Sequence, residues 1–370
     1  MKILQQCIYF PPEVGGLESH AFYLCRELVR MGHDVTMLTS RSKPDSAPVE
    51  TMDGVKVVRS WFPARNPAGW AAHTLATIPA HRRLARAADV LHAQTFASAP
   101  PAMVSRRPGQ PFVLTLHTSH FLRLAGRPAW RPVLRRIIRS ADWLLAASEE
   151  IRDVALAIHP HPRAEALTNG VDTAMFAPVR PAFEPRSEGY RVVVPRRLFE
   201  KNGVEYFVRA MPLIRQHVDV EALIIGDGPL RDRLERLARE LDVADAIRFL
   251  GARPNTEMPG LIASADAVVI PSLMEATSIA ALEAMSCERA VAASRVGGLP
   301  EIIDEEVGAL FEPGEPGSLA SAVLGLLQRP DRAAMGERAR ARVVRNWGLD
   351  RLARRHVEIY QQLLTGRKTA

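Results

Sequence analysis

Short apolar runs alternate with longer amphipathic segments along the whole chain. The runs are rich in Val, Ile and Leu, which is typical of strands buried in parallel sheets. In the first half they lie at Ile3–Tyr9, Val35–Thr39, Val55–Arg59, Val90–Ala93, Val113–His117 and Leu144–Ala147. In the second half they lie at Val192–Pro195, Ala222–Ile225, Ile247–Leu250, Ala267–Ile270 and Val291–Ser294.

The segments between these runs have the spacing of amphipathic helices. The clearest one is Leu17–Arg30, where apolar residues recur on one face, and Gly32 is placed to end it. The stretch Leu349–Leu364 repeats this pattern near the end of the chain. Alternating strands and helices predict an α/β fold with parallel sheets and right-handed crossovers.

A proline-rich segment divides the chain into two halves. Ala177–Arg186 contains three prolines, which predict a stiff connection outside both sheets. We therefore expect an N-terminal domain at 1–177, a linker at 178–189 and a C-terminal domain at 190–347. The last helix then occupies 348–370.

Composition limits the class of protein. The chain has 370 residues, 47% of them hydrophobic, which is enough for two domains with sizeable cores. Its three cysteines are widely spaced, which indicates reduced thiols in a cytoplasmic protein rather than a disulfide framework or a zinc site. The N-terminus is too short and too polar for a signal peptide, and no apolar run has the length of a membrane span.

The positive charge is concentrated in the first half. The net charge is +7, and through Arg180 the chain carries 22 basic and 14 acidic residues. No acidic residue lies between Arg106 and Arg139, and the second part of this stretch has the pattern of a basic amphipathic helix. Such a helix can bind an anionic membrane or acceptor, or its arginines can simply face water. The residues of this candidate surface are Arg127, Trp130, Arg131, Arg135, Arg136 and Arg139.

Nucleic acid is not an expected partner. Aromatic residues make up only 6% of the chain, and none of them forms a stacking ladder between the arginines.

The region after Ala267–Ile270 combines a strand end, a turn and a helix start. A polar turn carries Glu275, and Thr277 or Ser278 supplies the hydroxyl that caps the next helix. Ligands of open parallel sheets bind outside the carboxyl ends of the strands, so Glu275 is placed at a ligand-binding edge. Glu283 lies inside the helix, where a carboxylate is costly unless it is paired or used. The alternative is that both glutamates are solvated surface residues.

Glycines follow two of the predicted strands. Gly15 and Gly16 come after the first strand and open a helix, so the backbone there can approach a phosphate closely. Gly226 has the matching position in the second half. The spacing does not fit GxGxxG, so a dinucleotide-binding fingerprint is not supported, and both segments can also be plain turns.

Basic residues and a histidine occupy other strand ends. Arg197 and Lys201 follow the first strand of the second half, where a guanidinium fork and an ammonium suit a diphosphate. His117 ends a strand of the first half. All these candidates lie at the carboxyl edges of the two predicted sheets, and we expect the two edges to share one cleft.

Taken together, these segments resemble the retaining glycosyltransferases of family 4, which have the GT-B fold. The resemblance covers nearly the whole chain. It is carried by the glycine loop Pro11–Gly16, by Asn169–Phe176, by Glu275 and Glu283 at their spacing, and by Val296–Glu301.

The resemblance implies two Rossmann-like domains facing each other across a cleft, with the last helix crossing back to the N-terminal domain. It implies a donor site for a UDP- or GDP-sugar in the C-terminal domain. Arg197 and Lys201 would hold the diphosphate, Glu283 the ribose, and Glu275 the sugar, while His117 would line the acceptor side. The implied catalytic residues are Glu275, His117, Arg197 and Lys201. The implied donor-binding residues are Gly15, Gly16, Arg197, Lys201, Gly226, Glu275, Ala276, Thr277, Ser278 and Glu283.

Two departures from the family pattern concern the identity of the sugar. Ala276-Thr277-Ser278 stands where the family often has Gly-Phe-Gly, and Arg196 stands where it often has Gly.

No Asp-x-Asp pair lies on a loop, and fixed cations and helix N-termini can offset charge on a leaving phosphate. We therefore expect no cofactor and no metal requirement.

The expected activity is transfer of a hexose to a lipid-linked or polar glycan acceptor, in the cytoplasm or at the inner face of the plasma membrane. Two alternatives remain open at this point. One is a nucleotide-sugar epimerase of the same architecture, and the other is a non-catalytic peripheral membrane protein.

Overall fold

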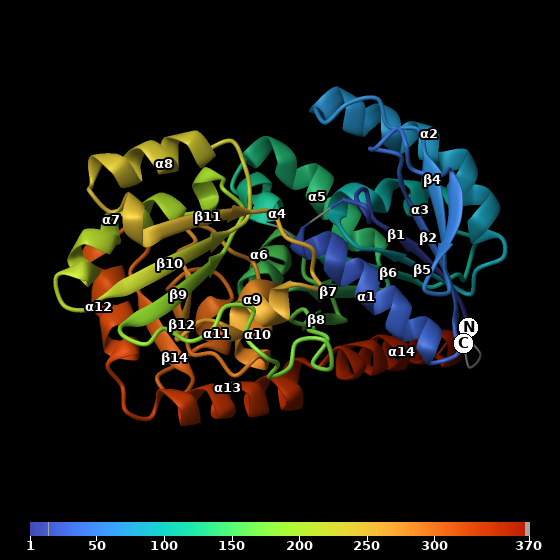
Figure 1. The fold of residues 1–370 in the computed structure, drawn as a ribbon. Coiled ribbons are helices and arrows are strands. Elements are labelled where there is room, and N and C mark those ends of the chain that lie inside the picture. The colour runs from blue at the N-terminus through green and yellow to red at the C-terminus, as the bar shows by residue number, and fades with distance from the viewer. Residues whose placement is uncertain (14, 118, 367–370) are drawn as a thin grey trace. The chain divides into compact units, whose positions relative to one another are not determined.

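The chain folds into two compact units, each built on a parallel sheet (Figure 1). The structure, a computed structural model, describes residues 1–13, 15–117 and 119–366. The first unit comprises Met1–Gly170 together with the segment from Leu349 onward, and the second comprises Val171–Gly348. The expected α/β class with parallel sheets is confirmed.

The first unit has an eight-stranded sheet of order β3-β4-β2-β1-β5-β6-β7-β8. Every pair in it is parallel except β3 and β4. The order reverses between β1 and β5, which makes their carboxyl ends a topological switch point. The strands are β1 (Lys2–Gln6), β2 (Asp34–Ser40), β3 (Val49–Met52), β4 (Val55–Ser60), β5 (Val90–Ala93), β6 (Phe112–Leu116), β7 (Trp143–Ala146) and β8 (Ala164–Ala166).

Helices cover this sheet. They are α1 (Gly16–Arg30), α2 (Pro67–Ala85), α3 (Ala99–Ser105), α4 (Ser119–Ala125), α5 (Arg131–Ser140), α6 (Glu149–Ile158) and α14 (Leu349–Thr365), with short 3₁₀ turns at Phe96–Ser98 and Pro128–Trp130. The terminal helix α14 packs on α1 and buries one apolar face against it, so it is an integral part of the first unit.

The second unit has a six-stranded parallel sheet of order β11-β10-β9-β12-β13-β14. This is the strand order of a doubly wound nucleotide-binding fold, with its switch point between β9 and β12. The strands are β9 (Tyr190–Pro195), β10 (Val220–Ile225), β11 (Ile247–Gly251), β12 (Ala267–Ile270), β13 (Val291–Ser294) and β14 (Gly308–Phe311).

Two apolar clusters form the core of this unit. One contains buried residues of α7, α8 and α12, and the other contains buried residues of α9, α10, α11 and α13. The helices are α7 (Val204–Arg215), α8 (Arg231–Glu240), α9 (Met258–Ala263), α10 (Ile279–Ser286), α11 (Leu299–Ile302), α12 (Pro316–Leu327) and α13 (Arg332–Trp347), with 3₁₀ turns at Glu200–Asn202 and Ala244–Ala246.

The predicted strands were wrong in a few places. The first strand ends at Gln6 rather than Tyr9, and the strand predicted to end at His117 ends one residue earlier. Three strands had no prediction: β3, β8 and β14. They are short, and β3 and β8 are only partly buried, so none carries the continuous apolar run of a central strand.

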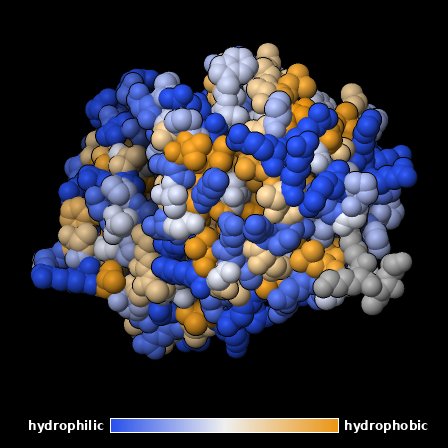
Figure 2. Space-filling model, turned by 90° about the vertical axis from the view of Figure 1, so that its right-hand side faces the viewer, coloured by the Kyte–Doolittle hydropathy of each residue, from blue (hydrophilic) through white to orange (hydrophobic). Residues whose placement is uncertain are grey.

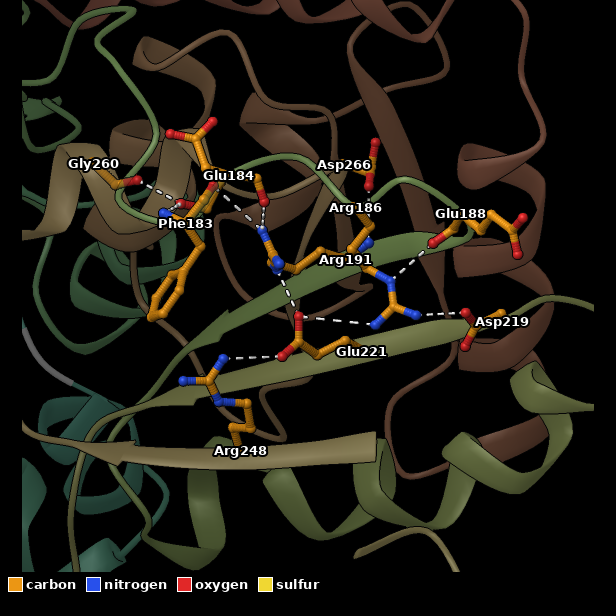
Figure 3. A network of polar contacts seen from close by, with 11 residues as sticks. Phe183, Glu184, Arg186, Glu188, Arg191, Asp219, Glu221, Arg248, Gly260 and Asp266 are labelled. Carbon is orange, nitrogen blue, oxygen red and sulfur yellow. Dashed lines mark hydrogen bonds and ion pairs between the residues drawn. The ribbon is translucent and has the colours of Figure 1, made fainter. Parts of the chain in front are cut away.

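The segment expected to be a stiff linker makes contacts with the strands of the second sheet (Figure 3). Phe183 donates its backbone N–H to Ser264, and its ring lies under the guanidinium groups of Arg191 and Arg248, at 5.5 and 4.8 Å. Glu221 of β10 accepts hydrogen bonds from both arginines, at 2.8 and 3.1 Å. Burial opposes ionisation of Glu221, but these hydrogen bonds outweigh it and lower its pKa. This network lies where β9, β10 and β11 begin, at the opposite end of the strands from the candidate site.

Helix α2 is unusual because its outer face is apolar. It carries no charged residue before Arg82, and Leu75 on it is 68% exposed. Trp61, in the segment that precedes it, is also exposed. The face that carries α2 and β4 mixes hydrophilic and apolar side chains, and the apolar ones gather in its middle and upper part (Figure 2).

Candidate active site

Two loops meet at the switch point of the second sheet. One follows β9 and the other follows β12. The carbonyl of Lys201 accepts hydrogen bonds from the backbone N–H groups of Leu273 and Met274, at 2.8 and 3.2 Å. Gly203 has φ +65°, and a side chain there would place its Cβ 1.8 Å from the carbonyl oxygen of Pro271. Glycine is therefore needed for the loops to approach this closely.

Glu275 lies in this second loop and is paired with an arginine of the first. The guanidinium of Arg196 contacts both the carboxylate of Glu275 and the hydroxyl of Ser272. The Arg196 and Glu275 side chains are only 11% and 16% exposed, so Glu275 is not the solvated surface residue of the alternative interpretation. A second support comes from Gly297, whose missing Cβ leaves room for the carbonyl of Glu275.

Helix α10 begins directly after this loop. Of the two predicted capping residues, Ser278 is the N-cap, and its hydroxyl accepts a hydrogen bond from the N–H of Ala281 at 3.3 Å. Ala276 and Thr277 are buried in the turn, and the carbonyl of Ala276 accepts a hydrogen bond from the N–H of Gly298. The helix start is thus fixed by both its own cap and the loop after β13.

Glu283 is the buried acid of this helix. The residue is 9% exposed, and among the residues that the structure describes its carboxyl group has no hydrogen-bond or ion-pair partner. Burial raises the pKa of Glu283 from 4.5 to about 8. A carboxyl group so costly to ionise is typical of a functional site, because a ligand hydroxyl can supply the missing partner.

The two predicted diphosphate ligands are both exposed on the loop after β9. Arg197 lies over the ring of Phe199 at 5.6 Å, and its carbonyl accepts a hydrogen bond from the side chain of Asn202 at 2.6 Å. Lys201 stands in the 3₁₀ turn of the same loop. The structure therefore brings Arg197, Lys201 and Glu275 onto two loops that are hydrogen-bonded to each other.

Gly226 joins this arrangement through its backbone. A Cβ there would lie 2.2 Å from the carbonyl of Arg196, and its φ is +145°. The absence of a side chain at Gly226 therefore lets the loop after β10 pack closely on the loop after β9.

In the first unit, His117 follows β6 and is buried. Its Nε2 lies 2.8 Å from the side-chain oxygen of Gln94, which follows β5 at the switch point of this sheet. Its ring lies 4.7 Å from that of His20 in α1. Burial lowers the pKa of His117 to about 3, so the ring is neutral. Gly15 and Gly16 lie where α1 begins, with Gly15 as N-cap.

Three residues of the candidate site were not predicted from the sequence. Arg196 was treated only as a departure from a family pattern, although its position after a strand end could have indicated a partner for Glu275. Ser272 and Gln94 also follow strand ends, and this position was their only signal.

Comparisons with known proteins identify the family. A family model described as "Glycosyltransferase Family 4" matches residues 14–175, and one described as "Glycosyl transferases group 1" matches residues 178–342. The chain is 32% identical, over 98% of its length and 97% of the relative's, to a GDP-mannose-dependent alpha-(1-6)-phosphatidylinositol monomannoside mannosyltransferase of Mycolicibacterium smegmatis. It is also 32% identical, over 92% of its length and 89% of the relative's, to a glycogen synthase of Mycobacterium tuberculosis.

Solved structures share the fold. A sucrose-phosphate synthase of Thermosynechococcus elongatus superposes with a TM-score of 0.86 at 22% identity, covering 99% of each chain. Anabaena HepE, solved in complex with UDP and glucose, has a TM-score of 0.77 at 19% identity and covers 98% of this chain and 99% of its own. With matching models over both units and a relative of nearly equal length, the protein belongs to family 4 of the glycosyltransferases and is of GT-B type.

Proposed function

We propose that this enzyme transfers a hexose from a nucleotide-diphosphate sugar to a lipid-linked or polar glycan acceptor, with retention of anomeric configuration. The observation that carries the proposal is the pair of joined loops at the switch point of the second sheet. They present Arg197 and Lys201 beside the turn of Glu275, and Glu283 lies buried in the following helix.

The chemistry follows from the charges. Breaking the bond between the sugar and the diphosphate leaves negative charge on the departing phosphate. Arg197 and Lys201 offset that charge electrostatically, as does the N-terminus of α10. Glu283 accepts hydrogen bonds from the ribose hydroxyls, and Glu275, held by Arg196, orients the sugar. In the first unit, His117 lines the acceptor side.

The donor is the first part of the proposal to test. Several relatives are named for GDP-mannose, and HepE was solved with UDP-glucose, so both donors are candidates here. Because a ligand that binds only the folded state raises its apparent stability, thermal unfolding with a panel of GDP-, UDP-, ADP- and TDP-sugars identifies the donor. We expect a shift with one nucleotide and none with free hexose. A panel without any shift would contradict donor binding and favour a non-catalytic protein.

An epimerase is distinguished by its product. An epimerase converts the nucleotide sugar with no acceptor present, whereas a transferase leaves the donor sugar unchanged unless an acceptor is added.

We propose that transfer needs no metal ion, because fixed cations supply the positive charge. Transfer measured with excess EDTA should then continue at its original rate, and a loss restored by added Mg²⁺ would contradict this.

The acceptor side is proposed to lie at an anionic membrane surface. Arg131, Arg135, Arg136 and Arg139 of α5 are exposed, while Leu134, Ile137 and Ile138 are buried under them. Among the described residues, none of the four arginines makes an ion pair. Trp130 and Val133 are exposed beside them, which supplies apolar contact as well as charge. No helix among the described residues is long and apolar enough to cross a membrane.

A further inference from the structure

A chain of buried hydrogen bonds connects the terminal helix to His117. The hydroxyl of Tyr360, on α14, lies 3.1 Å from Nε2 of Gln5 and 2.7 Å from Nδ1 of His92. Nε2 of Gln94 lies 2.7 Å from Oε1 of Gln5. Oε1 of Gln94 lies 2.8 Å from Nε2 of His117. Four elements of the first unit, β1, β5, β6 and α14, thus contribute to one polar path through an apolar core.

The orientation of the Gln5 and Gln94 amides sets the direction of each link in this path. Gln5 donates its amide hydrogen to Tyr360, so the tyrosine hydrogen is donated to Nδ1 of His92. The other nitrogen of His92 then carries its hydrogen and donates it to Thr115 at 2.7 Å. At the far end, the amide oxygen of Gln94 can only accept, so Nε2 of His117 is the donor.

Asn169 and three histidine rings act on His117. Hydrogen bonding with the side chain of Asn169 raises the pKa of His117, but burial outweighs it. The titratable groups that face it are the rings of His20 from α1, His92 from β5 and His356 from α14, and all are buried. Burial lowers the pKa of each of the three below the usual histidine value, so the cluster is uncharged near neutral pH. The only freedom left to the neutral ring is which nitrogen holds the hydrogen.

Nδ1 of His117 is left as an acceptor. It is buried and makes no hydrogen bond of normal geometry among the described residues, and neither does Oδ1 of Asn169, whose side chain also acts on this ring. Buried polar atoms are rarely left unpaired in folded proteins, and a substrate hydroxyl can donate to this nitrogen.

We propose that Tyr360, Gln5 and Gln94 are positioning residues, which hold His117 with its hydrogen on Nε2 and keep Nδ1 ready to accept a hydrogen bond from a substrate hydroxyl. The substrate part of this inference rests on the proposed function, which puts His117 on the acceptor side. The tautomer part rests on the hydrogen bonds alone. The terminal helix therefore contributes to the site through the core of its own unit.

The test uses the full chain labelled with ¹⁵N-histidine, with the His117 signals identified by their loss in His117→Phe. We expect the wild-type shifts to show a protonated Nε2 and an unprotonated Nδ1. Tyr360→Phe and Gln94→Met should each move His117 toward a mixture of tautomers. Transfer should fall about 2- to 10-fold in kcat with little change in KM, because one net hydrogen bond is lost. Tyr190→Phe in the second unit is the matched control and should change neither.

A second variant separates this role from a purely structural one. Gln94→Glu keeps an acceptor for Nε2 but adds a negative charge, so it should raise the pKa of His117 and make its shifts titrate between roughly pH 4 and 8. Shifts that stay unchanged in Tyr360→Phe and Gln94→Met, while both remain folded by thermal unfolding, would overturn the inference. Wild-type shifts with Nδ1 protonated would overturn it too. If the shifts change as expected but the wild type transfers no sugar, the hydrogen-bond chain stands and the proposed function fails.

Discussion

Glu283 has a buried carboxyl group whose pKa is raised to about 8 because burial disfavours the charged form. In the unfolded chain the same group titrates near 4.5. The folded state therefore keeps a proton that the unfolded state has lost, and stability falls as pH rises from about 4.5 to 8. Near pH 8 the cost is on the order of 3 to 5 kcal/mol relative to acid conditions.

Glu283→Gln should remove this cost. We expect the urea midpoint of the wild type to be lower at pH 8 than at pH 5, and this difference to shrink in the variant. Glu337→Gln, on the exposed face of α13, is the control and should behave like the wild type. Donor affinity measured above pH 8, where the wild-type side chain is ionised, should fall about tenfold in Glu283→Gln, since an amide accepts ribose hydrogen bonds less strongly than a carboxylate. An unchanged pH dependence would show that the carboxyl group is ionised at little cost.

The Arg196–Glu275 pair gives a second prediction at this scale. Arg196→Met leaves a largely buried carboxylate without its guanidinium, which typically costs about 3 kcal/mol. The double variant Arg196→Met with Glu275→Gln should recover part of that loss, because no uncompensated charge remains. Chemical unfolding of the wild type, both single variants and the double variant measures the coupling. Single losses that simply add would mean that the two side chains do not interact.

Residue chemistry was only partly predictable from the sequence. The position of Glu283 inside a helix, and the cap at Ser278, follow from local spacing. The partner of Glu275 could not be predicted from local spacing. Arg196 is 79 positions away along the chain and becomes the neighbour of Glu275 only through the pairing of β9 and β12. The same holds for Gln94 and Tyr360, which lie far apart in the sequence and are both hydrogen-bonded to Gln5.

At the scale of elements, α5 and α8 form a natural comparison. Both have ten residues and four arginines, but α8 also carries Asp232, Glu235 and Glu240, whereas α5 has no acid. A helix whose charged residues are all positive attracts an anionic surface. Each basic residue near such a surface contributes about 1 kcal/mol to the binding free energy. We expect α5, and not α8, to control binding to anionic membranes.

Charge reversal tests this directly. Arg135→Glu with Arg136→Glu in α5 should weaken co-sedimentation with phosphatidylglycerol vesicles at low salt by at least roughly 30-fold, because two contributions of that size are lost. Arg233→Glu with Arg236→Glu in α8 makes the same change in net charge and is the matched control. Equal losses in the two variants would mean that only net charge matters, and no binding by the wild type would rule out the membrane surface.

Most elements could be predicted because apolar runs and helical stripes are local. The predictions for β5, β12 and β13 match the structure residue for residue. The strands without a prediction lie at or next to sheet edges, where partial exposure breaks the apolar run. The contacts of the linker could not be predicted for a related reason, since they depend on arginines of β9 and β11 that look like solvated charges in the sequence.

For the whole molecule, the strand order of each sheet determines which loops can form a site. In the second unit the reversal between β9 and β12 brings together two loops that carry a cationic pair and an anchored carboxylate. The sequence predicts that these residues lie at strand ends. Which strand ends become neighbours is a property of the complete sheet, and a resemblance to family 4 supplied it before the structure did.

The central claim is that the loop after β9 binds the diphosphate of the donor. The most direct measurement is sugar transfer by the full chain, with the donor identified by thermal unfolding, in Arg197→Ala, Lys201→Ala and the control Arg236→Ala on the exposed face of α8. We predict that each loop variant loses at least about 100-fold in kcat/KM, as expected when a group that stabilises charge in the transition state is removed. The control should stay within about twofold of the wild type. Wild-type turnover in both loop variants would contradict the account.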